Sequence, residues 1–371
     1  MSTIAPPKPS IELGPLGLEN PMSTDGFEFV EYAAPDPELL RALFTKMGFP
    51  AVAKHKRKDV TLHRQGDINF IINAEPGSFE AQFAVDHGPC ACAMAFRVKD
   101  AKAAHQRALS LGAINALTDI QAGELPIPAI EGIGGSRLYF IDQYGGGDGN
   151  GGSIYDTDFA FFDGWQETMQ AADSRLTYLD HLTHNVNRGN MATWAEFYEK
   201  LFNFREIRYF DIEGKVSGLF SKAMTSPCGK IRIPLNESQD DKSQIEEYLR
   251  EYKGEGIQHI ALGSDDIYNA VDILAARGIP FQDTPDTYYE LLDERIEGHE
   301  ESIPELEKRN ILMDGAPTEG QGLLLQIFTQ NVIGPIFFEI IQRKGNEGFG
   351  EGNFKALFES IELDQIRRGV I

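Results

Sequence analysis

The chain has 371 residues, of which 42% are hydrophobic and 25% are charged, and its formal net charge is -23. This composition is typical of a globular protein, and the length corresponds to about two or three domains. The acidic charge argues against a nucleic acid or an anionic membrane surface as a partner, because both bind basic surfaces.

Cysteine content and hydropathy indicate the compartment. The three cysteines, Cys90, Cys92 and Cys228, are too few for a disulfide framework, so we interpret them as small core residues in a reducing compartment. Residues 1–21 are rich in Pro, Gly and Ser without the apolar segment of a signal peptide, and no run of about 18 apolar residues exists. We therefore expect a cytoplasmic protein without a membrane span, beginning with a flexible tail.

The first half, residues 22–153, is predicted to form a β-α-β-β-β module. A strand at Gly26–Ala33 precedes a helix that Asp36 caps and Gly48 ends. The glycine-rich segment Tyr144–Ser153 lacks the Lys-Ser/Thr of a phosphate-binding loop and is predicted to be a flexible connection. The other predicted elements are strands at Ala51–Lys54, Val60–Gln65, Ile68–Asn73, Cys92–Val98 and Arg137–Ile141, and a helix over Asp100–Leu111.

An aromatic linker over residues 154–174 leads to a second module, residues 175–371, with the same order of elements. An acidic insert, Thr284–Asn310, has no counterpart in the first half. The predicted elements are strands at Leu179–Val186, Glu206–Asp211, Val216–Phe220, Lys230–Pro234, Ile257–Leu262, Gly322–Thr329 and Pro335–Gln342, and helices at Met191–Leu201 and Asp265–Arg277.

Three anchor segments align the two halves. In both halves the second anchor is followed by an Asp, with a Gly at an equal distance beyond it. Two homologous modules explain this pattern, and the expected fold is α+β with tandem βαβββ repeats. The aligned pairs are Phe27–Val30 with Leu179–Leu182, Ala93–Phe96 with His259–Leu262, and Leu138–Phe140 with Phe338–Ile340.

At these anchors only the second half carries metal donors. The donors are His181, His259 and Glu339, each inside an otherwise apolar strand. A buried carboxylate without a partner costs several kcal/mol, so Glu339 requires a cation or hydrogen bonds. Two imidazoles and one carboxylate form the facial triad of non-haem Fe(II), and zinc with the same ligands is the alternative. The first half has Phe29, Ala93 and Tyr139 at the corresponding positions.

His184 lies three residues beyond His181 on the same predicted strand. Because side chains alternate between the faces of a strand, the two imidazoles cannot reach one ion. We therefore expect His184 not to be a ligand.

The C-terminal segment has helical periodicity. Phe354, Leu357, Phe358 and Ile361 recur at i, i+3, i+4 and i+7, and Asn353 is the expected N-cap. Glycines before this helix provide a hinge, so the helix is interpreted either as a lid or as part of the core.

Several longer motifs identify a family resemblance, which covers nearly all of residues 178–371 and, more weakly, the first half. The segments that carry it are Ile233–Glu237, Gly256–Ile260, Leu323–Phe328, Phe337–Arg343 and Gly348–Phe354. In these segments the second half resembles the bacterial 4-hydroxyphenylpyruvate dioxygenase family of the vicinal-oxygen-chelate superfamily.

The resemblance implies two vicinal-oxygen-chelate modules, the second an open barrel around Fe(II) that a C-terminal helix closes. It implies oxidative decarboxylation of 4-hydroxyphenylpyruvate with O2, ring hydroxylation and side-chain migration to homogentisate and CO2, in tyrosine catabolism. His181, His259 and Glu339 would bind the iron. The implied catalytic residues are Gln258, Gln326, Asn236, Ser221 and Gln244, and the implied substrate-binding residues are Phe328, Phe354, Phe358 and Pro234.

Alternative functions share the fold. They are 4-hydroxymandelate synthase, which hydroxylates the benzylic carbon, an extradiol dioxygenase or glyoxalase-like lyase, and a ligand-sequestering protein without activity. The segment Pro234–Asn236 and the C-terminal motif favour the dioxygenase. We expect a homo-oligomer, either a dimer or a tetramer, without a nucleic acid or membrane partner.

Overall fold

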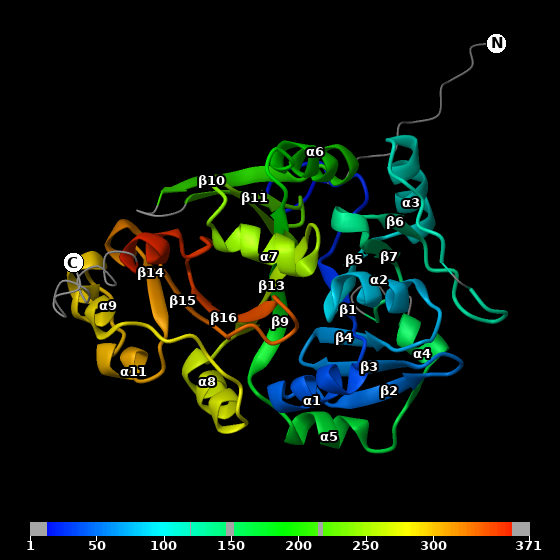
Figure 1. Ribbon diagram of the computed structural model, residues 1–371, viewed down its shortest axis with the longest axis horizontal. Helices are drawn as coiled ribbons and strands as arrows, with labels where there is room; N and C mark the ends of the chain where they lie inside the picture. The colour runs from blue at the N-terminus through cyan, green and yellow to red at the C-terminus, as the bar shows by residue number, and fades with distance from the viewer. Residues whose placement is uncertain (1–12, 119, 146–151, 214–217, 358–371) are drawn as a thin grey trace, which may run out of the picture.

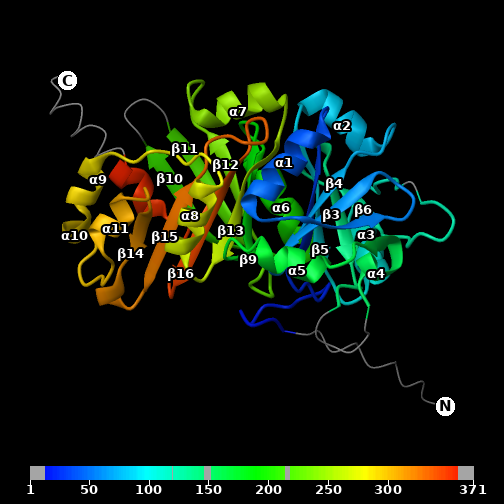
Figure 2. The same cartoon turned by 90° about the horizontal axis from the view of Figure 1, so that it is seen from below.

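A computed structural model describes residues 13–118, 120–145, 152–213 and 218–357 (Figure 1). Each half of the chain forms one mixed sheet, and the two modules lie side by side (Figure 2). The first sheet has the order β6 (Ala129–Glu131), β7 (Arg137–Ile141), β5 (Cys90–Arg97), β1 (Phe27–Ala33), β4 (Ile68–Asn73), β3 (Val60–Gln65), β2 (Ala51–His55) and β8 (Phe159–Phe161).

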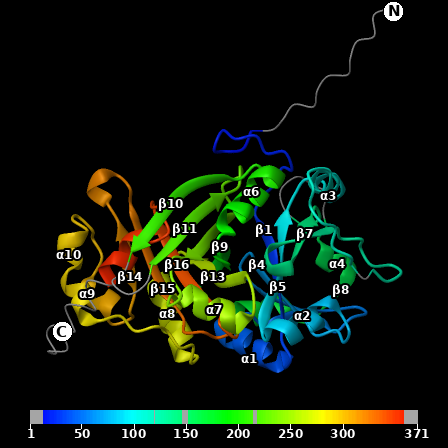
Figure 3. The same ribbon diagram turned by 45° about the horizontal axis from the view of Figure 1, so that its top comes forward.

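The second sheet curls into a half barrel (Figure 3). Its order is β10 (Arg205–Glu213), β11 (Gly218–Thr225), β12 (Arg232–Ser238), β9 (Leu176–Val186), β13 (Gly256–Ser264), β16 (Phe337–Lys344), β15 (Leu323–Phe328) and β14 (Leu312–Gly315).

Strand pairing confirms the predicted repeat. In the first sheet β1 pairs parallel with β4 and antiparallel with β5, and β5 pairs parallel with β7. In the second sheet β9 has the same relation to β12 and β13, and β13 to β16. The expected α+β fold of tandem modules is therefore confirmed.

Helix caps follow the sequence signals. The Asp36 side chain accepts from the backbone N–H of Glu38, and Gly48 ends that helix in the left-handed region. Asp100 and Asp266 cap the equivalent helices α3 and α8 of the two modules. The helices are α1 (Pro37–Met47), α2 (Phe79–His87), α3 (Ala101–Ser110), α4 (Ile154–Asp158), α5 (Trp165–Ala171), α6 (Met191–Phe202), α7 (Gln244–Tyr252), α8 (Ile267–Ala276), α9 (Asp286–Glu290), α10 (Leu292–Arg295) and α11 (Ile303–Glu307), with single 3-10 turns at Ile133–Gly135 and Pro317–Glu319.

Some elements differ from the sequence prediction. Helices α2 and α7 were not predicted, although α7 has apolar residues at 245, 248, 249 and 252 in helical spacing. The acidic insert contains α9, α10 and α11. The C-terminal helix begins at Glu351, so Asn353 lies in its first turn and the N-cap prediction was wrong. Phe358 and Ile361 lie outside the described residues.

One hydrophobic core joins the helix-covered faces of both sheets. Phe96 of β5 packs edge-on against Phe202 of α6, with ring centroids 5.3 Å apart, and Phe70 of β4 lies 5.9 Å from Phe338 of β16. All three cysteines are buried and unpaired. Among the described residues, no helix has the length and apolar character needed to span a membrane.

The opposite faces of the two sheets differ in composition. In the first module this face is filled by a second apolar cluster that includes Phe29, Leu62 and Ile71. In the second module the equivalent face carries His181 and Glu339, both buried. Buried metal donors on this face therefore occur in the second half barrel.

Candidate metal site

Three donor side chains meet on the inner face of the second sheet. His181 lies on β9, His259 on β13 and Glu339 on β16, which are adjacent strands. The Nε2 atom of His181 lies 3.2 Å from Oε2 of Glu339 and 3.3 Å from Nε2 of His259, and the third edge, from His259 Nε2 to Glu339 Oε2, is 3.4 Å. These atoms form an almost equilateral triangle.

The hydrogen bonds on the far side of each ring assign the tautomers. Nδ1 of His181 donates to Oδ1 of Asp180 at 2.8 Å, and Nδ1 of His259 donates to Oε1 of Gln258 at 3.1 Å. In a neutral imidazole the other nitrogen is then a lone-pair acceptor. Two imidazole lone pairs and one carboxylate oxygen then converge on one position, an arrangement suited to binding a cation.

Burial and charge agree with this assignment. Burial opposes the charged form of Glu339, but the adjacent His181 and His259 lower its pKa to about 2. Burial also opposes the charged form of His181, yet Glu339 and Asp180 together raise its pKa, whereas burial lowers the pKa of His259. The second oxygen of Glu339, Oε1, is buried without a hydrogen-bond partner. An anionic carboxylate with free lone pairs is thus held inside the barrel.

The triangle fits a single first-row metal ion. Ligand atoms at roughly 2.1 Å from an ion, at angles between facial octahedral and tetrahedral, are about 3.0–3.4 Å apart. The observed edges of 3.2–3.4 Å lie in this range. The donor set therefore fits the facial triad of Fe(II).

Register shows why the first module has no equivalent site. His181 and Glu339 both face Ala261 across their strand pairs, and Phe29 and Tyr139 both face Ala95 in the same way. The predicted correspondence of the anchors is confirmed in three dimensions.

Histidine 184 lies outside the cluster. It is buried, and its Nδ1 atom lies 3.1 Å from the carbonyl oxygen of Leu182. Burial lowers the pKa of His184 to about 4. A neutral structural histidine is consistent with this position.

Polar residues implied by the resemblance lie on strands beside the triad. Ser221 on β11 is directly opposite Asn236 on β12, with Pro234 two residues earlier on the same strand. Gln326 on β15 is buried, and its Oε1 atom has no hydrogen-bond partner. Ser221, Asn236 and Gln326 therefore all lie on strands of the half barrel. Gln244 begins helix α7 and is exposed, so it lies apart from the buried donors.

Aromatic residues surround the histidines. Phe328 is opposite Glu339 in the sheet, and its ring centroid lies 6.2 Å from that of His259. Phe354 is 39% exposed on the C-terminal helix. Phe337 stacks on His259 at 5.0 Å, and Phe349 meets His181 edge-on at 5.4 Å. The sequence prediction did not include these last two rings.

Sequence reasoning also missed Asp180 and Arg343. Asp180 precedes His181 and binds both that histidine and Arg343, whose Nε and Nη2 atoms lie 2.7 and 2.8 Å from the carboxylate oxygens. The available signal was a carboxylate adjacent to a predicted ligand, because metal-binding histidines commonly donate to one.

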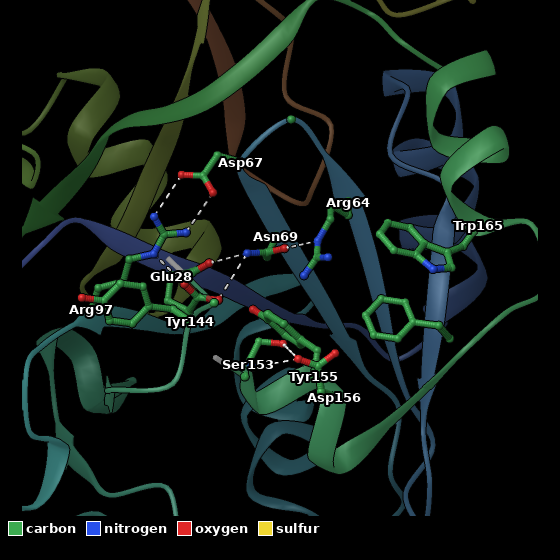
Figure 4. A pocket seen from close by; sticks show the side chains of 14 residues that line it. Glu28, Arg64, Asp67, Asn69, Arg97, Tyr144, Ser153, Tyr155, Asp156 and Trp165 are labelled. Carbon is green, nitrogen blue, oxygen red and sulfur yellow. Dashed lines mark hydrogen bonds and ion pairs between the residues drawn. The ribbon is translucent and has the colours of Figure 1, made fainter. Parts of the chain in front are cut away.

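A cavity of about 550 Å³ opens in the first module (Figure 4). Arg97 on its wall is paired with Glu28 at 2.6 Å and bidentately with Asp67. Arg64 donates to Asn69 and lies over the ring of Tyr155. In this cavity Arg97 is thus paired with two carboxylates, Arg64 contacts a neutral amide and an aromatic ring, and no metal-ligand cluster occurs among the described residues. The convergent donors of the second module identify the better candidate site.

Comparison with known proteins agrees with this architecture. Residues 18–160 match the family described as hydroxyphenylpyruvate dioxygenase, N-terminal, and residues 178–293 match the glyoxalase/bleomycin resistance protein/dioxygenase superfamily. The chain is 62% identical to hemolysin VllY of Vibrio vulnificus, over 95% of this chain and 98% of that protein. It is 61% identical to 4-hydroxyphenylpyruvate dioxygenase of Pseudomonas aeruginosa, over 95% and 97% of the two chains. A solved variant of 4-hydroxymandelate synthase from Streptomyces coelicolor is 26% identical with a TM-score of 0.76, over 93% and 100% of the chains.

Proposed function

The chain belongs to the 4-hydroxyphenylpyruvate dioxygenase family, and from this premise we propose that it is an Fe(II) enzyme that converts 4-hydroxyphenylpyruvate and O2 to homogentisate and CO2. The observation that carries the proposal is the convergence of His181 Nε2, His259 Nε2 and Glu339 Oε2 on one position. These three residues would hold the iron, which would remain accessible to substrate and oxygen.

Iron held by this triad supplies redox chemistry and a positive charge that attracts an α-keto carboxylate. We infer from this that the reaction uses the α-keto acid group of the substrate itself. The protein residues then have three tasks: they hold the ligand atoms in place, they orient the substrate and they exclude water from the reacting groups.

We assign the orientation of the substrate to polar residues on the strands and helix beside the triad. Ser221 and Asn236 face each other across β11 and β12, so their side chains can bind one polar group of the substrate together. We retain Gln244, on the first turn of α7, as the third member of this set. Gln258 and Gln326 are assigned to the iron side of the substrate, since Gln258 already contacts His259 and the Gln326 oxygen has a free lone pair.

Aromatic side chains are assigned to the substrate ring. Phe328 lies beside His259, and Pro234 precedes Asn236 on the strand that borders the site. Phe354 is on the C-terminal helix, and Phe358 is assigned the same role from the sequence, because it lies outside the described residues. An apolar wall keeps water away from the reacting groups.

The test is product identification. Purified protein is incubated with Fe(II), ascorbate and 4-hydroxyphenylpyruvate under air, and the product is identified by mass spectrometry and NMR, with His181→Ala as the inactive control. Homogentisate supports the proposal. Hydroxymandelate as the product would instead assign the activity of 4-hydroxymandelate synthase, whose solved variant has a similar fold. Oxygen uptake by His181→Ala at the wild-type rate would refute the metal assignment.

We also propose the biological setting. We propose a domain division into a tail (1–21), a first module (22–153), a linker (154–174) whose strand β8 pairs with β2 of the first sheet, and a catalytic module (175–371). The net charge of -23 and three unpaired buried cysteines support a cytoplasmic protein. A homo-oligomer, dimer or tetramer, is proposed for the intact enzyme, and light scattering of the purified protein would determine the subunit number.

A further inference from the structure

We propose that Asp180 is a positioning residue for the ligand His181, and that Arg343 couples this carboxylate to the segment Gly348–Phe354, which begins the C-terminal helix. The proposal rests on the proposed Fe(II) function of the triad. It adds residues that neither bind the metal nor touch the substrate.

The Asp180 carboxylate is fully buried and is bound by His181 and Arg343, with a longer ion pair to Nη1 of Arg232 at 3.6 Å. Its Oδ1 atom accepts from His181 Nδ1 at 2.8 Å and from Arg343 Nη2 at 2.8 Å, while Oδ2 accepts from Arg343 Nε at 2.7 Å. The bidentate arginine fixes the plane of the carboxylate, and the carboxylate fixes the imidazole plane and its proton. The lone pair of Nε2 therefore points at the other two ligands before any ion binds.

A β-bulge places Asp180 where it can do this. The register between β9 and β13 shifts between the pairs of His181 and Leu179, which leaves Asp180 as the extra residue. Bulges redirect side chains in this way. In the first module the register between β1 and β5 shifts at Glu28, the residue before Phe29. Both modules thus carry a buried carboxylate at the same bulge.

The two carboxylates differ in what they contact. Glu28 accepts from Arg97 at 2.6 Å and from Asn69 at 3.4 Å, and the residue that follows it is Phe29. Its carboxylate–arginine pair therefore holds no metal ligand. In the second module the same kind of pair also holds a metal ligand. Glu28 is consequently a matched control for Asp180 within one chain.

Arg343 extends the hydrogen-bond network to the segment that precedes the C-terminal helix. Its Nη1 atom donates to the carbonyl oxygens of Gly348 at 2.7 Å and Asn346 at 3.0 Å, and its guanidinium carbon lies 5.8 Å from the ring centroid of Phe349. The Phe349 ring in turn packs edge-on against His181. Two paths from this segment, one polar and one aromatic, therefore end on the same imidazole.

The experiment measures metal binding by the metal-free full chain, with Co(II) as a redox-stable probe. Asp180→Asn is expected to raise the Co(II) dissociation constant by roughly 10- to 100-fold, the range for removing a partner of a metal ligand. Glu28→Gln is expected to leave it unchanged, although it also breaks a buried carboxylate–arginine pair. Equal dissociation constants for Asp180→Asn and the wild type, or equal losses in the two variants, would overturn the positioning role.

Coupling is tested by amide hydrogen exchange over residues 346–354. Co(II) should slow exchange in the wild type and in Glu28→Gln, and should slow it less in Arg343→Lys, because lysine cannot hold two carboxylate oxygens and two carbonyls at once. Arg343→Lys also serves if Asp180→Asn does not fold. Undiminished slowing in Arg343→Lys would refute the coupling. Failure of the wild type to bind Co(II) would refute the proposed metal function instead.

Discussion

Phe29 and Tyr139 pack against each other with ring centroids 5.7 Å apart, at the register positions that His181 and Glu339 occupy in the second sheet. The two modules therefore share one backbone frame and fill it differently. Aromatic rings make the first a solid support, whereas convergent lone pairs make the second a metal site. Substitutions at these positions should therefore lower stability in the first module and weaken metal binding in the second.

The first prediction concerns His259. His259→Gln should weaken metal binding by more than about 100-fold, beyond the loss seen when only a partner of a ligand is removed, because one of the three lone pairs is displaced. Chelation should lower the melting temperature of the wild type, since a ligand at 100-fold excess over Kd stabilises the native state by about 2.7 kcal/mol. The variant should show no such change. Metal content and calorimetry with and without chelator measure both effects.

A matched control is His87→Gln on α2. His87 also packs against aromatic rings, in tilted pairs with centroids 4.2 Å from Phe83 and 4.6 Å from Tyr252, but it lies outside the triad. The His87→Gln variant should retain the metal, and chelation should still lower its melting temperature. Loss of metal in both variants would show that aromatic stacking, and not ligation, accounts for the effect.

The second prediction concerns Gly350. A Cβ atom at this position would lie 1.8 Å from Oε1 of the buried Gln326, so Gly350→Ala must displace either that side chain or the segment before the C-terminal helix. We expect kcat/KM to fall by at least about 10-fold, equivalent to 1.4 kcal/mol of transition-state stabilisation. Steady-state oxygen uptake measures the change.

Gly320→Ala separates this clash from backbone strain. Gly320 has φ +77°, close to the +75° of Gly350, but its Cβ would meet nothing within 4 Å. Gly320→Ala should lose stability on the order of 1 kcal/mol from the left-handed backbone alone, and Gly350→Ala should lose more because the clash adds to the same strain. Only Gly350→Ala should lose activity, and an equal loss in both would contradict the proposed role of Gln326.

The third prediction concerns pH and Glu31 in the first module. Burial, together with the nearby Glu80 carboxylate, raises the pKa of Glu31 from 4.5 to about 8. Between these values the folded state binds a proton that the unfolded state has lost, so stability falls as the pH rises. In the wild type this proton should make the free energy of unfolding fall by on the order of 2–4 kcal/mol between pH 5 and 8, and Glu31→Gln should remove that fall.

Urea unfolding at pH 5, 6.5 and 8 measures this effect. The glutamine oxygen can still accept the hydrogen bond that Asn73 donates to Glu31, so the variant should fold at every pH. A pH dependence identical to that of the wild type would exclude Glu31 as its source. The metal site lies in the other module, and metal-free protein can be used throughout.

The fourth prediction assigns a role to the acidic insert. The hydroxyl of Tyr288 on α9 donates to Oδ1 of Asn353 at 2.6 Å and accepts from the backbone N–H of Met313 at 3.0 Å. Tyr288→Phe leaves these buried groups without this partner and should destabilise the protein by about 1–3 kcal/mol. Limited proteolysis near residues 346–357 should accelerate, because Asn353 lies in the first turn of the C-terminal helix.

Tyr268→Phe on α8 is the control, since its hydroxyl donates to a single carboxylate, Oε2 of Glu301, at 2.8 Å and is half-buried. It should cost less than about 1 kcal/mol and leave the proteolysis rate unchanged. The partner of Tyr268, Glu301, also lies in the insert, whereas the partner of Tyr288, Asn353, lies in the C-terminal helix, so equal proteolysis rates for the two variants would show that the Tyr288–Asn353 hydrogen bond does not anchor that helix.

Periodicity and internal repetition were sufficient to predict most of the framework. Strands β1, β9, β13 and β16 lie where apolar runs were recognised, and Asp36, Asp100 and Asp266 cap their helices as the sequence indicated. Local signals of this kind depend only on neighbouring residues. Asn353 shows their limit, because a residue suited to an N-cap instead binds Tyr288 from the insert.

The sequence by itself determined that the donors would come from one module, because His181, His259 and Glu339 stand where the repeat has Phe29, Ala93 and Tyr139. Only the tertiary structure decided how they are held. A β-bulge turns the Asp180 carboxylate toward its neighbour His181, and two groups distant in sequence complete the surroundings: Arg343 binds Asp180, and the ring of Phe349 packs on His181. Such contacts depend on strand register and chain crossing between residues far apart in sequence, which no local pattern specifies.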